Sequence, residues 1–173
     1  MNSGKIFEKN FQQSVPNYAL IYRLPDSAQS FGGNDKLRFS RKSPFDFLLW
    51  DSKHHNLLAL EMKTVLGNSI SFERSKDDSG VIHYHQIKEL TKWREYGILA
   101  GFIIEFRGFE TTIFLGIDSF NILIERINKK SINYSDILNS GLPYHIIPQS
   151  IKRTNYTYDI DYFLTNINME DRK

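Results

Sequence analysis

The sequence predicts an α/β fold in which a mixed β-sheet is flanked by α-helices. A chain of 173 residues is long enough to bury one sizeable core and rarely long enough for two. An apolar hairpin pattern fills Phe45–Lys63, and an amphipathic helix at His83–Tyr96 is followed directly by an apolar strand. Such a passage from helix to strand is typical of a sheet covered by helices. No internal repeat, low-complexity tract or linker divides the chain, so residues 1–173 are expected to form one domain.

The first elements in the chain are a short helix and a strand. Ser3–Val15 has Phe7 and Phe11 on one helical face, and a proline then ends the pattern. Tyr18–Leu24 is rich in β-forming residues and predicts a strand. The polar stretch that follows, Pro25–Lys42, is the longest irregular segment, and loops of this length are often functional or mobile.

The middle of the chain has the pattern of a β-hairpin. Apolar runs at Phe45–Trp50 and Asn56–Leu60 flank a polar segment that reads Asp-Ser-Lys-His-His. The second run is apolar on both faces, so we expect a buried central strand. A turn centred between Lys53 and His54 would fix the register of the two strands.

Three charged side chains interrupt this hairpin. In that register Asp46 lies directly opposite Glu61, where two like charges repel across roughly 5 Å. A divalent cation is the obvious compensation, because hard cations prefer carboxylate oxygens. Lys63 lies two residues beyond Glu61 and points to the same face of the strand. Glu-x-Lys alone is often only a solvated face of a strand or helix; the buried hairpin and the opposed Asp46 strengthen the case for a metal site, and both interpretations stay open at this point.

Such a trio suits the hydrolysis of phosphodiesters. Asp46 and Glu61 would hold Mg²⁺, which lowers the pKa of a bound water and neutralises charge on the phosphate. Lys63 could orient that water or stabilise the charge that develops on the phosphoryl oxygens.

The C-terminal half is expected to continue the alternation of helices and strands. A glycine at position 97 is placed to end the helix at His83–Tyr96. The other predicted elements are a short strand after Gly67, strands at Ile98–Phe106 and Thr111–Ile117 joined by a turn at Arg107–Glu110, a helix N-capped by Asp118 or Ser119 with Phe120, Leu123, Ile124 and Ile127 on one face, a helix at Ser135–Ser140, and a terminal helix at Asp159–Ile167.

Net charge is only +2, which neither requires nor excludes a nucleic-acid partner, but basic residues cluster locally. A local basic patch is what a phosphate backbone needs, although solvated loop charge is an equally good reading of any one cluster. The clusters are Lys36, Arg38, Arg41 and Lys42 ahead of Asp46, the pair Lys129 and Lys130, and the pair Lys152 and Arg153.

Several classes of protein are excluded or disfavoured. The absence of cysteine excludes disulfides, thiolate metal sites and a cysteine nucleophile. No phosphate-binding glycine loop is present, because Gly32-Gly33 lacks the required lysine and hydroxyl. The histidines do not have zinc-site spacing, since His83 and His85 at a helix start are expected to point to different faces. No apolar run suits a signal peptide or a membrane helix, so we expect a soluble, cytoplasmic protein.

Five short motifs in order resemble a known family. They are Gly-Lys-x-Phe-Glu from Gly4 to Glu8, Ser-x-Phe-Asp-Phe from Ser43 to Phe47, Leu-Glu-Met-Lys-Thr from Leu60 to Thr64, Ser-Phe-Glu-Arg from Ser71 to Arg74, and His-x-His-Gln-Ile from His83 to Ile87. Together they resemble the RecU-type Holliday junction resolvases and their phage-borne relatives, within the PD-(D/E)XK nuclease superfamily. The likeness spans Gly4 to about Phe163.

The resemblance implies a restriction-endonuclease-like α/β core, a homodimer, Mg²⁺ or Mn²⁺, and paired nicks in a four-way DNA junction during recombination or repair. It implies that Asp46, Glu61 and Glu8 bind the metal, that Lys63 is the catalytic lysine, and that Gln86 contacts the metal-bound water or the phosphate. DNA contacts are expected from Arg74, His85 and Lys88, together with the basic residues Lys36, Arg38, Arg41 and Lys42. The expected location is the cytoplasm of a bacterial or phage-infected cell.

Two features depart from the family pattern. The motif reads Pro44-Phe45-Asp46 rather than Pro-Asp. The stalk-like insertion near residues 25–42 is shorter than the stalk of cellular RecU proteins, which leaves broader cleavage of branched DNA open. The alternatives are therefore another PD-(D/E)XK nuclease, of the restriction, flap or fork type, and a DNA-binding recombination protein without catalysis.

Overall fold

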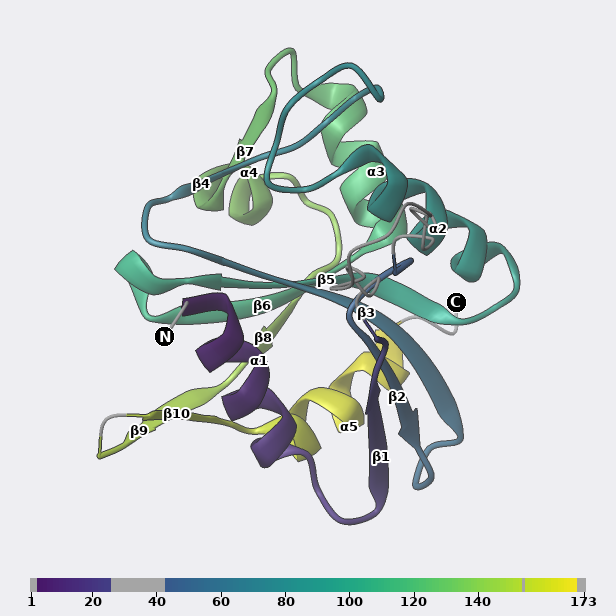
Figure 1. Cartoon of the computed structure of the whole chain (residues 1–173), viewed down its shortest axis with the longest axis vertical. Coiled ribbons are helices and arrows are strands. Elements are labelled where there is room, and N and C mark those ends of the chain that lie inside the picture. The colour runs from purple at the N-terminus through teal and green to yellow at the C-terminus, as the bar shows by residue number, and fades with distance from the viewer. Residues whose placement is uncertain (1–2, 26–42, 154, 171–173) are drawn as a thin grey trace, which may run out of the picture.

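A six-stranded mixed sheet runs through the centre of the protein, and helices cover both of its faces (Figure 1). The fold comes from a computed structural model that describes residues 3–25, 43–153 and 155–170. The strand order is β1-β2-β3-β5-β6-β8, in which β3 and β5 are parallel and every other neighbouring pair is antiparallel. The predicted fold class, a mixed α/β sheet flanked by helices, is confirmed.

The helices and strands alternate along the chain much as the sequence predicts. In order they are α1 (Ser3–Ser14), β1 (Ala19–Arg23), β2 (Phe47–Asp51), β3 (Asn56–Val65), β4 (Ser69–Ser71), α2 (Tyr84–Glu95), β5 (Leu99–Phe106), a 3₁₀ turn (Arg107–Phe109), β6 (Thr111–Gly116), α3 (Ile117–Arg126), β7 (Ser131–Asn133), α4 (Tyr134–Asn139), β8 (His145–Ile147), β9 (Gln149–Lys152), β10 (Asn155–Tyr158) and α5 (Ile160–Glu170).

The β2–β3 hairpin has the predicted register. Phe47 pairs with Leu60 and Asp51 with Asn56, so the turn is centred between residues 53 and 54. His55 adopts a left-handed conformation with φ of 59°, which allows the tight reversal. On its other edge β3 pairs in parallel with β5, and this places it in the buried middle of the sheet.

Two hydrophobic cores lie on opposite faces of the sheet. Helices α2 and α3 pack on one face, where Phe72, Phe102 and Phe120 are fully buried. Helices α1 and α5 cover the other, where Phe11 and Phe163 are fully buried. Full burial of an aromatic side chain stabilises a fold by about 2–3 kcal/mol, so these cores hold β3 rigidly from both sides.

Some predictions about individual elements are wrong. Helix α3 begins at Ile117 with Gly116 as its N-cap, not at Asp118 or Ser119, because the chain passes directly from β6 into the helix. Strands β7 to β10 were not anticipated; each has only three or four residues. Gly97 does take the positive φ, 81°, that ends α2.

The stalk-like insertion lies almost entirely outside the residues that the structure describes. Residues 26–42 are not described, so the predicted DNA contacts of Lys36, Arg38, Arg41 and Lys42 stay predictions. Within the described ranges, no helix combines the length and the apolar character required to span a membrane.

Candidate active site

Asp46 directly precedes β2, and hydrogen bonds to β3 hold both its backbone and its carboxylate against that strand. Its backbone N–H donates to the carbonyl oxygen of Leu60 at 3.2 Å. Its Oδ2 accepts the backbone N–H of Met62 at 2.8 Å. Because these two bonds flank Glu61 on the facing strand, the predicted opposition of Asp46 and Glu61 is confirmed.

Glu61 is buried, with only 2% of its surface exposed, and its two oxygens are in different situations. Oε1 contacts Nζ of Lys63 at 2.8 Å and accepts a hydrogen bond from Nε2 of Gln86 at 2.5 Å. Oε2 is also buried, and no donor reaches it from the described residues. A buried carboxylate oxygen normally has a partner, so this orphaned atom fits the role of a cation ligand.

Gln86 is oriented by the start of α2. Its Oε1 accepts the backbone N–H of His83 at 2.9 Å, as part of a capping box. The amide nitrogen must therefore point away from the helix end, and it points at Glu61. The resemblance implied a contact with metal-bound water or phosphate; the contact observed is with the carboxylate.

The two carboxylates have raised pKa values. Burial raises the pKa of Glu61 from 4.5 to about 7, with the nearby Asp46 acting in the same direction and Lys63 opposing both. Burial also raises the pKa of Asp46, and so does the charge of Glu8, while the Met62 N–H, Lys63 and Arg23 lower it. Burial is therefore the main cost of ionising both carboxylates, and a cation beside them would offset it.

Glu8 lies on α1 near Asp46, and its carboxylate forms an ion pair with Arg23. The guanidinium Nε of Arg23 donates to Oε2 of Glu8 at 2.9 Å. The charge of Glu8 acts on Asp46, which places the three carboxylates in one electrostatic neighbourhood. Direct metal ligation by Glu8 stays a prediction.

The residue set fits a divalent cation with few protein ligands. In the part of the chain that the structure describes, no three His, Cys, Asp or Glu side chains are grouped to bind a metal. Two carboxylates and an orphaned buried oxygen nevertheless match the preference of Mg²⁺, which is often bound by one or two carboxylates with water and phosphate completing its shell. Asp46 and Glu61 are therefore the candidate ligands.

Two of the basic residues predicted to contact DNA, Arg74 and Lys88, have different surroundings. Arg74 donates from Nη2 to the carbonyl oxygens of Ile127 and Lys129, at 2.7 and 3.0 Å, so it closes the end of α3. Lys88 is exposed, with its Nζ 5.6 Å from the centre of the Tyr84 ring. Their roles in binding DNA stay predictions.

One prediction about the histidines is wrong. The rings of His83 and His85 stack, with centres 5.6 Å apart, instead of pointing to different faces. His83 is the N-cap of α2 and has an extended backbone, so helical spacing does not apply to it. The DNA contact expected of His85 stays a prediction.

Sequence reasoning missed two residues that support the site. Glu73 accepts the backbone N–H of Tyr84 at 2.8 Å and contacts Nδ1 of His83 at 2.7 Å, which fixes the start of α2. The Tyr84 bond and His83 hold the pKa of Glu73 below its usual value. Arg23 is the other, and a lone charge in the apolar Tyr18–Leu24 strand was a signal that could have found it.

Comparisons with known proteins show similarity in structure but not in sequence. No protein-family model matches the chain, and no curated protein matches it in sequence. Among solved structures the chain is similar to Hjc, a Holliday junction resolvase from the archaeal hyperthermophile Archaeoglobus fulgidus. The similarity has 15% identity and a TM-score of 0.42, and covers 70% of this chain and 79% of that one.

Proposed function

We propose that this protein is a Mg²⁺-dependent DNA endonuclease of the PD-(D/E)XK type. One observation carries the proposal: Glu61 is buried beside Asp46 with one oxygen held by Lys63 and Gln86 and the other without a donor from the described residues. Perturbed carboxylates arranged in this way are more typical of a working site than of a structural contact. The hairpin register and the mixed sheet agree with what the ordered motifs imply.

Each residue of the site has a definable task in phosphodiester hydrolysis. Asp46 and Glu61 would hold Mg²⁺, which when bound supplies charge neutralisation at the phosphate and a more acidic water. Gln86 fixes Glu61, and the Met62 N–H fixes Asp46, so both carboxylates are positioned before substrate arrives.

Lys63 is placed to act on the substrate itself. Its side chain is 14% exposed and its Nζ lies 2.8 Å from Glu61. An ammonium group held there can donate to a phosphoryl oxygen or orient the attacking water. Mn²⁺ has similar ligand preferences and should replace Mg²⁺.

The proposed substrate is a four-way DNA junction, cut by a homodimer with paired nicks. The order of the five motifs supports this choice over linear DNA. The second candidate is a nuclease with the same chemistry on flaps, forks or restriction-type sites, which the short segment at 25–42 favours. A non-catalytic DNA-binding role is less favoured because Asp46, Glu61 and Lys63 are all present.

The chemistry is tested with Asp46→Asn, which keeps the size of the side chain and removes its charge. With Mg²⁺ and a labelled four-way junction, cleavage should fall at least about a thousand-fold, while junction binding in EDTA is retained. Asp118→Asn is the matched control, since Asp118 is exposed on α3 and pairs only at the surface with Arg94. Unchanged cleavage by purified Asp46→Asn would exclude this site.

The substrate is tested separately. Wild-type protein is given a junction, a flap, a fork and a linear duplex at equal DNA concentration with Mg²⁺. Symmetric nicks in the junction support the resolvase proposal, whereas preferred cutting of a linear duplex at one sequence supports the restriction-type alternative. If no substrate is cut and calorimetry detects no Mn²⁺ uptake with DNA present, the non-catalytic alternative stands.

A further inference from the structure

The β9–β10 hairpin is a small arm that stands apart from the central sheet. Its strands pair only with each other among the described strands, from Tyr158 with Gln149 to Asn155 with Lys152. Figure 1 shows it extending from the body of the protein at the lower left. A two-stranded hairpin is marginal on its own in water, so its stability depends on contacts with the rest of the protein.

The base of this arm is firmly anchored. The Tyr158 hydroxyl donates to Oε1 of Glu105 at 3.0 Å, and the Tyr158 backbone N–H donates to Oγ of Ser14 at 3.1 Å. The Thr112 hydroxyl donates to Oε1 of Gln149 at 2.6 Å. These bonds reach β5, α1 and β6, so the direction in which the arm extends is fixed.

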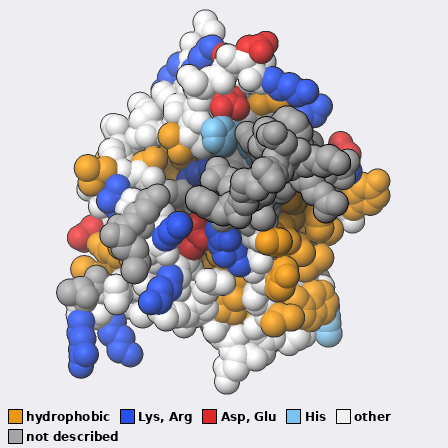
Figure 2. All heavy atoms as spheres, in the orientation of Figure 1, with side chains coloured by type: hydrophobic (Ala, Val, Ile, Leu, Met, Phe, Trp, Pro, Cys, Tyr) orange, Lys and Arg blue, Asp and Glu red, His pale blue; other side chains and the backbone are white. Residues whose placement is uncertain are grey.

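Helix α1 lies between the arm and the candidate active site. Its Ser14 contacts the arm, while its Glu8 faces Arg23 and acts on Asp46. Lys5 and Lys9, four residues apart, share the outward face of the helix and are exposed. Figure 2 shows Lys and Arg side chains gathered over α1 and the arm on one face of the molecule.

Four of these cations form what we name the basic arm surface: Lys5, Lys9, Lys152 and Arg153. All four are exposed, and no ion pair joins any of them to a carboxylate in the described part of the chain. The arm has no acidic residue between Gln149 and Tyr158, and the only acid of α1 is Glu8, which Arg23 engages.

The contrast with another basic pair is informative. Lys129 contacts Asp136 at 2.6 Å, and Lys130 is paired with Asp78. Those charges are locally neutralised, whereas no carboxylate in the described part of the chain pairs with the basic arm surface. Exposed cations gathered on one face of a protein complement a phosphate backbone.

We infer that the basic arm surface binds the DNA backbone on the α1 side of the candidate active site. This inference rests on the proposed function and deepens it, because it names where the duplex lies beyond the cleaved phosphate. Arg153 has φ of 62°, a conformation uncommon for arginine, at the turn of the arm. Ile151 is 60% exposed next to Lys152 and offers an apolar contact to the sugars.

Binding is measured by fluorescence anisotropy on a labelled duplex and a labelled four-way junction, in EDTA so that nothing is cut. We expect Lys152→Ala/Arg153→Ala to weaken binding about ten-fold and to reduce the slope of log affinity against log salt by about two. Lys5→Ala/Lys9→Ala should have a similar effect. Lys129→Ala/Lys130→Ala is the matched control, which removes two cations at the other end of the protein and should change neither quantity.

A second measurement identifies contact directly. Because the chain lacks cysteine, one cysteine introduced at Asn155 on the arm can carry a photoactivated cross-linker. Asn155→Cys should cross-link to bound DNA, and Ser135→Cys, exposed on α4, should not. Unchanged affinity and salt slope in both arm-surface variants, or equal losses in the control pair, would overturn the inference, and so would equal cross-linking from both positions.

These outcomes are separable from those of the proposed function. If Asp46→Asn still cleaved DNA, the proposed active site would be contradicted, but the anisotropy test of the basic arm surface would be unaffected. Conversely, normal cleavage together with unaltered DNA binding in the arm variants would support the nuclease proposal and contradict DNA binding by the basic arm surface.

Discussion

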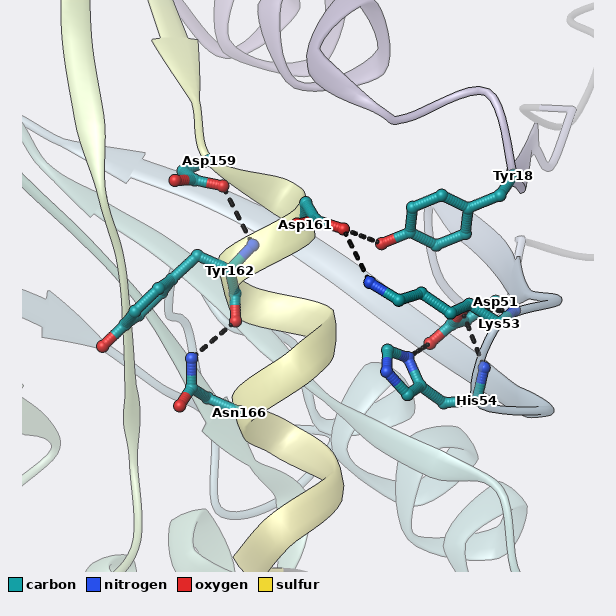
Figure 3. A network of polar contacts seen from close by, with 8 residues as sticks. All are labelled: Tyr18, Asp51, Lys53, His54, Asp159, Asp161, Tyr162 and Asn166. Carbon is teal, nitrogen blue, oxygen red and sulfur yellow. Dashed lines mark hydrogen bonds and ion pairs between the residues drawn. The ribbon is translucent and has the colours of Figure 1, made fainter.

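The two ends of the β2–β3 hairpin both bury a carboxylate, but only one end satisfies it. At the turn, Asp51 is fully buried, and its Oδ1 accepts the backbone N–H groups of Lys53 and His54 at 3.0 and 3.2 Å (Figure 3). Its Oδ2 contacts Nδ1 of His54 at 2.7 Å. At the opposite end, Glu61 is almost as buried and leaves Oε2 without a donor from any described residue.

On the proposal that Glu61 binds Mg²⁺, this difference separates a structural carboxylate from a metal-binding one. Asp51 closes the turn by taking up donors that would otherwise be unpaired, which is a local Asx-type arrangement. Glu61 is held by two donors on one side only, and burial raises its pKa to about 7. At the turn end the described residues satisfy both carboxylate oxygens, whereas at the other end one oxygen is left for the proposed Mg²⁺.

The largest stability effect is expected at the satisfied end. Asp51→Ala removes three contacts in a buried position and leaves their donors unpaired, so unfolding in urea should become easier by about 3 kcal/mol. Cleavage per folded molecule should be unchanged, because the turn lies at the far end of the hairpin from Glu61. Loss of cleavage in a fully folded Asp51→Ala protein would contradict this division.

The register of the β2–β3 hairpin could be predicted from the sequence, whereas the β9–β10 arm could not. A turn centred between Lys53 and His54 was enough to place Asp46 opposite Glu61, because hairpin register follows from the turn. The β9–β10 arm was not predicted: its outer strand positions are exposed on both faces, so it lacks the alternation that marks a half-buried strand.

Long-range polar contacts were also beyond the sequence. Glu73 reaches His83 and Tyr84 across a loop, and no local spacing encodes that contact. Gln86 entered through the family resemblance alone, and its bond to Glu61 depends on the packing of α2 beside β3. The start of α3 was misplaced because a serine and an aspartate resemble an N-cap even where the strand runs straight into the helix.

The next effect concerns pH and the unsatisfied end. A raised pKa means that folded Glu61 keeps its proton between pH 4.5 and about 7 while unfolded Glu61 has lost it. Its contribution to stability is therefore present below pH 4.5 and is lost as pH rises to about 7, by about 2–3 kcal/mol.

Glu61→Gln cannot ionise and should flatten this slope in urea unfolding of the metal-free protein. Asp46 also has a raised pKa and acts in the same direction, so some slope remains. If wild type and Glu61→Gln have parallel stability curves between pH 5 and 7, the raised pKa is wrong.

A smaller effect comes from adding Mg²⁺, which should stabilise the unsatisfied end alone. At about ten times the dissociation constant, a ligand that binds only the folded state contributes about 1.4 kcal/mol. Thermal unfolding of wild type should shift upward with Mg²⁺, and Asp46→Asn should lose most of the shift. Asp51→Asn should keep it in full, and an equal loss in both variants would remove the distinction between the two ends.

The smallest effect is expected at the rim of the turn, where Tyr18 and Lys53 both contact Oδ1 of Asp161, at 2.6 and 3.3 Å. Tyr18→Phe removes one exposed hydrogen bond and leaves the lysine, so stability at pH 7 should fall by less than about 1 kcal/mol. Burial and the bond to Asp161 raise the pKa of Tyr18 above its ordinary 10.0. The contribution of this phenol is therefore complete below pH 10 and is lost as pH rises further. Denaturation curves of wild type and Tyr18→Phe should converge above pH 10, and curves that stay parallel there would show that the hydroxyl is not held by Asp161.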